Sequence, residues 1–102
     1  PTSANKEDHV SMGTIAARQC REVIENTENV IAIELLCATQ ALDLFTNLKP
    51  GEGTLEAYHE IRKTISHLEK DRILSQDIAD MKTLIRNAAI LKAVEKKVGE
   101  LN

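Results

Sequence analysis

The 102-residue chain is short enough for a single domain, and its 42% hydrophobic and 28% charged residues are typical of a folded globular protein rather than a disordered one. Aromatic residues make up only 2% of the chain, and helix-forming residues dominate over glycine and proline, which predicts an all-α fold. The net charge of −3 argues against a nucleic-acid partner, since phosphate binding requires clustered lysine and arginine side chains.

The sequence contains no segment that is expected to span a membrane. A membrane helix needs about 18 uncharged apolar residues, and the most apolar run, residues 30–45, is shorter and contains Glu34 and Asp43. There is also no signal-peptide pattern and no Asn-x-Ser/Thr acceptor for glycosylation. We therefore expect a cytoplasmic protein with neither a membrane nor a nucleic acid as its partner.

The first predicted helix runs from residue 11 or 12 to about residue 45, with Ser11 or Thr14 as its cap, and residues 1–10 before it are expected to be flexible. Apolar side chains point in nearly every direction around its second half: Val30, Ile31, Ile33, Leu35, Leu36, Leu42, Leu44 and Phe45. Burying them would contribute roughly 12 to 24 kcal/mol, and the rest of so short a chain can cover only part of this surface. We therefore expect a homo-oligomer or a fragment of a larger helical protein.

A break at residues 47–53 separates this helix from a second one. Pro50 forbids continuation of the first helix, and the two glycines that follow permit a tight reversal. Thr54 is the predicted cap of the second helix, over residues 55–70. Its apolar stripe consists of Leu55, Tyr58, Ile61, Ile65 and Leu68.

A connection at residues 71–74 leads to a third predicted helix with Ser75 as its cap, Asp77 in its first turn and Gly99 at its end. Its apolar positions recur every three or four residues: Ile78, Met81, Leu84, Ile85, Ala88, Leu91, Val94, Val98 and Leu101. Residues 1–102 are thus predicted to form one all-α segment of three helices, the first of them long, which is part of an extended bundle that packs through oligomerisation.

The sequence shows no self-contained active-site pattern. A His-Glu pair at residues 59–60 begins like the zinc motif of a metalloprotease, but Lys63 stands where the second histidine is required. We interpret His59 and His67 as histidines on a helix surface, and we expect no metal site. No glycine-rich phosphate-binding loop occurs either.

The cysteines and the C-terminal lysines are also interpreted as structural. Cys20 and Cys37 fall on one predicted helix about 25 Å apart, too far for a disulfide, and we expect them to be free, buried thiols. The run Lys92, Lys96 and Lys97 is expected to be a solvated helix face.

Residues 3–13 form a polar segment that is dense in ionisable groups and precedes the long helix. Such a segment can contact a substrate, although acidic groups near a helix start also have a purely structural explanation in the helix dipole. The sequence Glu-Asp-His-Val-Ser-Met-Gly at residues 7–13 resembles the histidine ammonia-lyases. The same resemblance extends over residues 15–18, 22–27, 32–36, 48–51, 53–54, 68–69 and 71–72.

The resemblance implies that this chain is the C-terminal fifth of a homotetrameric enzyme that removes ammonia from L-histidine to give urocanate. The family uses a methylidene-imidazolone group, which forms from an Ala-Ser-Gly tripeptide. That tripeptide is absent here, because the four glycines follow Met12, Pro50, Glu52 and Val98. The fragment alone is therefore expected to be inactive, with the remainder of the lyase chain and the neighbouring subunits as its partners.

The resemblance assigns one site residue to this chain, Glu7, both as a catalytic and as a substrate-binding group. It matches the glutamate that meets the imidazole ring of the substrate, and a carboxylate can accept a ring N–H. Relatives usually have glutamine at the position of Lys6, and a lysine there could pair with Glu7 or Asp8 and lower the carboxylate pKa.

Two other functions stay open at this point. The chain could be a stand-alone helical module that oligomerises or binds a partner through its apolar helix. It could also belong to a tyrosine or phenylalanine lyase or to an aminomutase, although Glu7 favours imidazole over a neutral ring.

Overall fold

The computed structural model describes residues 2–45, 47 and 49–101, with side chains described from Met12 onward. Over this part of the chain, four helices and no strand are present: α1 (Thr2–Leu44), α2 (Glu52–Thr64), α3 (Ser75–Arg86) and α4 (Ala89–Val98). The predicted all-α class and the long first helix are confirmed. The predicted number of three helices is wrong, because the last one is divided.

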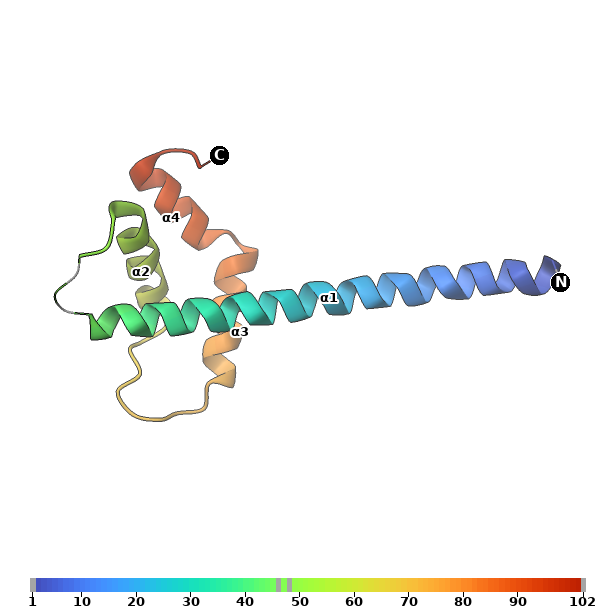
Figure 1. Cartoon of the computed structure of the whole chain (residues 1–102), viewed down its shortest axis with the longest axis horizontal. Helices are drawn as coiled ribbons and strands as arrows, with labels where there is room; N and C mark the ends of the chain where they lie inside the picture. Colours follow the sequence, from blue (N-terminus) through green and yellow to red (C-terminus); the bar gives the residue numbers. More distant parts are fainter. Residues whose placement is uncertain (1, 46, 48, 102) are drawn as a thin grey trace.

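Helix α1 is a 43-residue rod that projects far beyond the other three helices, which gather around its C-terminal part (Figure 1). The predicted start at residue 11 or 12 is wrong, since the helix already begins at Thr2. No proline interrupts residues 2–12, so the polar residues there continue the helix instead of capping it. The expected flexibility of residues 1–10 stays a prediction.

Helix α2 is shorter than predicted and shifted toward the N-terminus. It starts at Glu52 with Gly51 as its N-cap, and not with Thr54. It ends where Ile65 adopts an extended conformation, with φ −115° and ψ 113°. Residues 65–70 leave the helix because their backbone has partners elsewhere: the side-chain amide of Gln40 donates to the carbonyl oxygen of Leu68 at 3.1 Å and accepts from its N–H at 3.2 Å.

The predicted third helix is split at Asn87 and Ala88 into α3 and α4. The predicted cap is wrong, because Leu74 is the N-cap of α3 and Ser75 is its first residue, whereas Asp77 lies in the first turn as predicted. Gly99 ends α4 as predicted, at a positive φ of 91° that suits glycine. The corner turns α4 onto α2, while α3 packs against α1.

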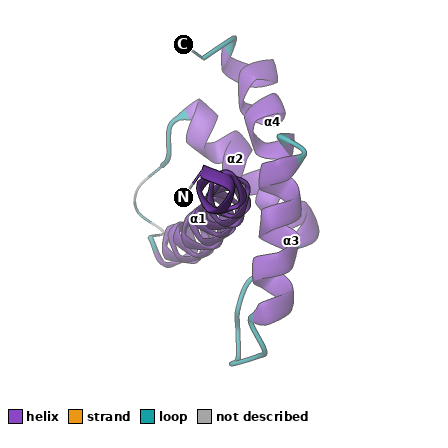
Figure 2. Ribbon diagram, turned by 90° about the vertical axis from the view of Figure 1, so that its right-hand side faces the viewer, coloured by secondary structure: helices purple, strands orange, loops and turns teal. Residues whose placement is uncertain are grey.

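A small core forms where α1, α2 and α3 meet. Its buried apolar residues are Ala32, Ile61, Ile65, Met81 and Leu84. The small side chain of Ala32, which is fully buried, lets the other helices approach α1 closely. Figure 2, which looks along α1, shows that α3 and α4 lie to one side of it and that no helix covers the opposite side.

Much of the apolar surface of α1 is exposed, as its all-round pattern predicted. The large hydrophobic residues of α1 that remain exposed are Met12, Ile15, Val23, Ile24, Val30, Ile31, Ile33 and Leu44. Among the described residues, no helix has the length and apolar character needed to cross a membrane. These exposed residues of α1 are called the exposed stripe.

Candidate functional site

The predicted site residue Glu7 lies in the N-terminal part of α1, on the segment that extends away from the helical cluster (Figure 1). Its side chain, like those of Lys6 and Asp8, is outside the described part of the structure. None of the other three helices packs around this end of α1 (Figure 1). The groups that complete a site around Glu7 must therefore come from outside this chain.

The structure brings together a polar cluster that sequence reasoning missed, at the C-terminal end of α1. The carboxylate of Asp43 accepts hydrogen bonds from the hydroxyl of Tyr58 and from the guanidinium of Arg62. The Nδ1 atom of His67 lies 2.7 Å from Oδ2 of Asp43. Because an ionised carboxylate only accepts, Nδ1 must carry the proton in this contact. Residues from α1, α2 and the segment after α2 thus converge on one carboxylate.

Asp43 is ionised in this cluster. Its burial raises the pKa, but the hydrogen bonds from Tyr58, His67 and Arg62, together with the positive charge of Arg62, outweigh burial and hold the pKa of Asp43 at about 2. The carboxylate side chain is only 13% exposed and sits near the negative end of the α1 dipole, where an unpaired anion is unfavourable. A carboxylate with so low a pKa is a poor proton acceptor near neutral pH. Asp43 therefore serves as an anchor between helices rather than as a catalytic base.

The connection between α2 and α3 is tied down by a second group of polar contacts. Arg72 donates to the carbonyl oxygens of Ser66 at 2.7 Å and His67 at 3.2 Å, and its Nε donates to Asp77 at 2.9 Å. His67 therefore lies in the connection after α2, and its predicted place on a helix is wrong. Its predicted exposure to solvent is confirmed, because its side chain is 40% exposed.

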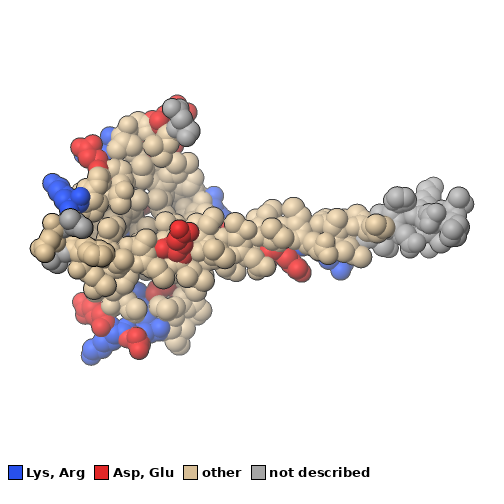
Figure 3. All heavy atoms as spheres, viewed as in Figure 1, with Lys and Arg blue, Asp and Glu red and all other residues tan. Residues whose placement is uncertain are grey.

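An apolar groove of about 480 Å³ lies beside this connection, along the exposed face of α1. One wall belongs to α1 and includes Ile33, Leu36 and Leu44, and the opposite wall includes Leu74 and Ile78. In Figure 3, most of the visible face of α1 carries neither acidic nor basic groups. The groove and the stripe together form an apolar surface that fits an additional helix better than a small polar substrate.

Both cysteines are free, as predicted, but the predicted burial is wrong because Cys20 and Cys37 are exposed. Cys20 lies on the projecting part of α1, and Cys37 lines the apolar groove. Burial was expected because cysteine is commonly enclosed in protein interiors. In the part of the chain that the structure describes, both thiols are left exposed on α1.

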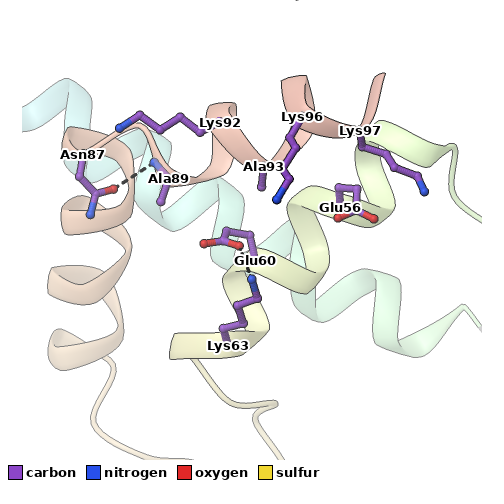
Figure 4. Close-up of a pocket in the computed structure, with 9 residues that line it drawn as sticks. All are labelled: Glu56, Glu60, Lys63, Asn87, Ala89, Lys92, Ala93, Lys96 and Lys97. Atoms are coloured by element: carbon purple, nitrogen blue, oxygen red, sulfur yellow. Dashed lines mark hydrogen bonds and ion pairs between the residues drawn. The ribbon is translucent and has the colours of Figure 1, made fainter. Parts of the chain in front are cut away.

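A second groove, of about 700 Å³, is lined on one side by α2 and on the other by α4 and the corner before it (Figure 4). Lys63 pairs with Glu60 at 2.9 Å, and this hydrogen bond raises the pKa of Lys63. Lys96 extends from α4 toward α2, whereas Lys92 and Lys97 point toward the two ends of the groove. The predicted solvated lysine face is confirmed, since all three are exposed. Because the three ammonium groups diverge, they do not build a site for a single anion.

His59 is exposed on α2. In the described part of the chain, no group of three or more His, Cys, Asp and Glu side chains is arranged to hold a metal ion. The Asp43 cluster left little signal in the sequence, because its members are spread over three elements and only Tyr58 and Arg62 share the i,i+4 spacing of one helix face.

The chain is similar in sequence to one family of known enzymes. Residues 1–63 match the family model for the aromatic amino acid lyases. The chain is 50% identical over 101 residues to a histidine ammonia-lyase of Natranaerobius thermophilus. The aligned region covers 99% of this chain and 20% of that protein. It is 51% identical over 102 residues to a histidine ammonia-lyase of Gloeobacter violaceus, with coverage of 100% and 20%.

A third relative, a histidine ammonia-lyase of Alkaliphilus oremlandii, is 50% identical over 98 residues, which is 96% of this chain and 19% of that protein. The chain thus spans about a fifth of the length of these relatives. No solved structure gives a significant match. The family model covers more than half of the chain and identity extends over almost all of it, so the chain belongs to the aromatic amino acid lyase family.

Proposed function

We propose that this chain is the C-terminal segment of a histidine ammonia-lyase, which deaminates L-histidine to urocanate and ammonia in the cytoplasm. The observation that carries the proposal is about 50% identity along nearly the whole chain to several proteins with that name. An aromatic amino acid lyase with another substrate would share the family model, but the three relatives compared all carry the histidine name.

The proposed contribution of the segment is a scaffold and one carboxylate. The exposed apolar stripe of α1 supports packing against the remainder of the lyase and against symmetry-related subunits of a homotetramer. Glu7 would accept a ring N–H of the bound L-histidine and help to set the protonation state of the imidazole. The polar cluster around Asp43 would hold α2 against the other end of the same helix.

The electrophile of the reaction would come from elsewhere in the lyase. The family's methylidene-imidazolone group activates the amino acid for loss of ammonia. Its Ala-Ser-Gly precursor does not occur in residues 1–102, so no residue of this chain fits the role. On this proposal the purified chain forms no urocanate from L-histidine, and urocanate formation by it would contradict the assignment of the electrophile to another part.

A chimera tests the proposed activity directly. The part of the Natranaerobius thermophilus relative that matches this chain would be replaced by residues 1–102, and urocanate would be followed by its ultraviolet absorbance. We expect activity on L-histidine. Glu7→Gln should lower kcat/KM at least about tenfold, the effect of losing one hydrogen bond to a charged group. Glu22→Gln, at an exposed position of the same helix, is the matched control.

The alternatives predict different outcomes of the same experiment. A tyrosine or phenylalanine lyase or an aminomutase would make the chimera active on L-tyrosine or L-phenylalanine but not on L-histidine. A stand-alone helical module would leave the chimera folded and inactive on all three amino acids. A folded, tetrameric chimera without urocanate formation would therefore reject the proposed function.

A further inference from the structure

The corner between α3 and α4 is made by a residue in an unfavourable backbone conformation. Ala88 adopts φ 57° and ψ 26°, in the left-handed region, and it is the one non-glycine residue of the described chain with a positive φ. An L-residue with a Cβ atom is strained there, whereas glycine is not. Asn87 supports the corner, because its Oδ1 accepts the N–H of Ala89 at 3.0 Å.

The local sequence favours a straight helix at this place. The corner contains neither glycine nor proline, and alanine is the best helix former of all residues. The apolar stripe also passes through the corner without a change of phase, from Leu84 and Ile85 through Ala88 to Leu91. The end of α4 differs, since there Gly99 takes up the positive φ. The bend at Ala88 therefore runs against the helix propensity of alanine and is held by the Asn87 side chain and by packing.

The packing that favours the bend is the contact of α4 with α2. Helix α4 packs far more extensively on α2 than on α3. The two helices lie close together at Gly53, where an added Cβ would lie 3.4 Å from Val94 Cγ1 and 3.7 Å from Val98 Cγ1. No residue of α4 is fully buried, however. Helix α4 is thus an arm that is joined to α3 through a strained corner and is held mainly by α2.

We propose that α4 is exchanged between two copies of this chain. In the exchanged dimer, α3 and α4 of each copy join into one straight helix over residues 75–98, and each α4 packs on the α2 helix of the other copy. All α2–α4 contacts are kept, because the second copy offers the same surface around Gly53. The strain at Ala88 is relieved in both copies, and the N–H groups of Ala88 and Ala89 exchange their present acceptors, the Ile85 carbonyl and Asn87 Oδ1, for the i−4 carbonyls of a continuous helix. A short, strained connection is the kind that promotes such exchange.

The exchange is independent of the proposed lyase function and of association through α1. Dimers that form through the exposed stripe of α1 leave each α4 on its own α2, so that positions 53 and 98 of one chain stay together. Exchange instead places position 53 of one copy beside position 98 of the other. Disulfide formation between these two positions in different chains therefore reports exchange specifically.

The test uses the 102-residue chain with Cys20→Ser and Cys37→Ser, so that only introduced thiols react. One version carries Gly53→Cys, and a second version with a tag of different mass carries Val98→Cys. The two are mixed, oxidised in a glutathione buffer at increasing protein concentration and separated on a non-reducing gel. We expect the 53–98 disulfide between different chains to exceed the 53–53 and 98–98 products at least about tenfold. A purely statistical distribution of the three products would overturn the proposal.

Variants of the corner provide the second arm of the test. Ala88→Gly removes the strain of the bent form and weakens the straight helix, so the dimerisation constant should fall about 30-fold per corner and about 900-fold for the two corners of a dimer. Ala88→Val, which is poorly tolerated at positive φ, should raise the yield of the 53–98 product. Circular dichroism checks that both variants keep their helix content. If Ala88→Val does not fold, Ala88→Gly decides alone, and a 53–98 yield that Ala88→Gly leaves unchanged would reject the strained corner as the cause.

Discussion

The Nδ1 atom of His67 lies 2.7 Å from Oδ2 of Asp43, which connects the segment after α2 to the last turn of α1. The same carboxylate oxygen is paired with Arg62, so one acidic group receives contacts from two later elements. Asp43 stands at the negative end of a 43-residue helix, where its charge is stabilised by these partners and not by the helix itself. The angle between α1 and α2 therefore depends on this carboxylate, and stability should follow its charge.

Replacing Asp43 by Asn is expected to lower the free energy of unfolding by about 3 kcal/mol, because Arg62 would remain mostly buried without its charge partner. Asp71→Asn, at an exposed position of the connection after α2, is the control and should change stability by less than about 0.5 kcal/mol. Urea denaturation followed by circular dichroism measures both. Equal effects of the two substitutions would show that the cluster does not anchor the helices.

The stability contributed by Asp43 should be lost in acid. Its pKa is lowered from 3.8 to about 2 in the folded chain. A carboxyl group with a lowered folded pKa contributes stability that is present above its unfolded pKa and is lost as the pH falls toward the folded value. Between pH 5 and pH 2, the free-energy difference between the wild type and Asp43→Asn should therefore shrink by roughly 2 kcal/mol. Thermal melts across this range measure it, and a difference that stays constant would contradict the assigned pKa.

The ion pair between Glu28 and Arg86 should also stabilise the fold when Glu28 is ionised, but only weakly. The hydrogen bond from Arg86, which links α3 to α1, lowers the pKa of Glu28. The Arg86 side chain is 59% exposed, so solvent and salt screen the pair. Glu28→Gln should shift the melting temperature only slightly at low salt and not at all at high salt. A large shift that persists in high salt would mean that the pair is more shielded than its exposure indicates.

The small core should be sensitive to truncation at its centre. Met81 is fully buried among residues from α1, α2 and α3. Met81→Ala should therefore cost about 2 to 5 kcal/mol, from the lost transfer free energy and the cavity that remains. Leu101→Ala is the matched control, since Leu101 is 53% exposed and its truncation should be nearly neutral. Chemical denaturation distinguishes the two, and a neutral Met81→Ala would place the core elsewhere.

Association through α1 should depend on its exposed apolar stripe. Val30 is 63% exposed, so Val30→Asp should leave the fold of the single chain intact. It should nevertheless reduce association, because a charge at the centre of an apolar interface is costly. Glu34→Gln, one turn further along the helix, serves as the control. Light scattering over a range of concentrations measures both variants, and a wild-type chain that stays monomeric throughout would contradict the expected association.

The features that could be predicted from the sequence are local ones. The long first helix followed from the lack of breaking residues before Pro50, and the terminator at Gly99 followed from glycine's tolerance of positive φ. The same 3–4 spacing that predicted the third helix also predicted its continuation through Ala88, where it was wrong. The end of α2 was misplaced for a related reason, since the Gln40 side chain competes for the backbone of Leu68.

The sequence by itself determined the all-α class, the exposed apolar rod and the likeness of residues 7–13 to the ammonia-lyases, because each depends on residues that are close together in the chain. Only the tertiary structure decided the corner at Ala88 and the convergence of Tyr58, Arg62 and His67 on Asp43. Both arise where separate helices meet, and contacts between distant residues can outweigh local helix propensities, which amount to less than about 1 kcal/mol for an ordinary residue.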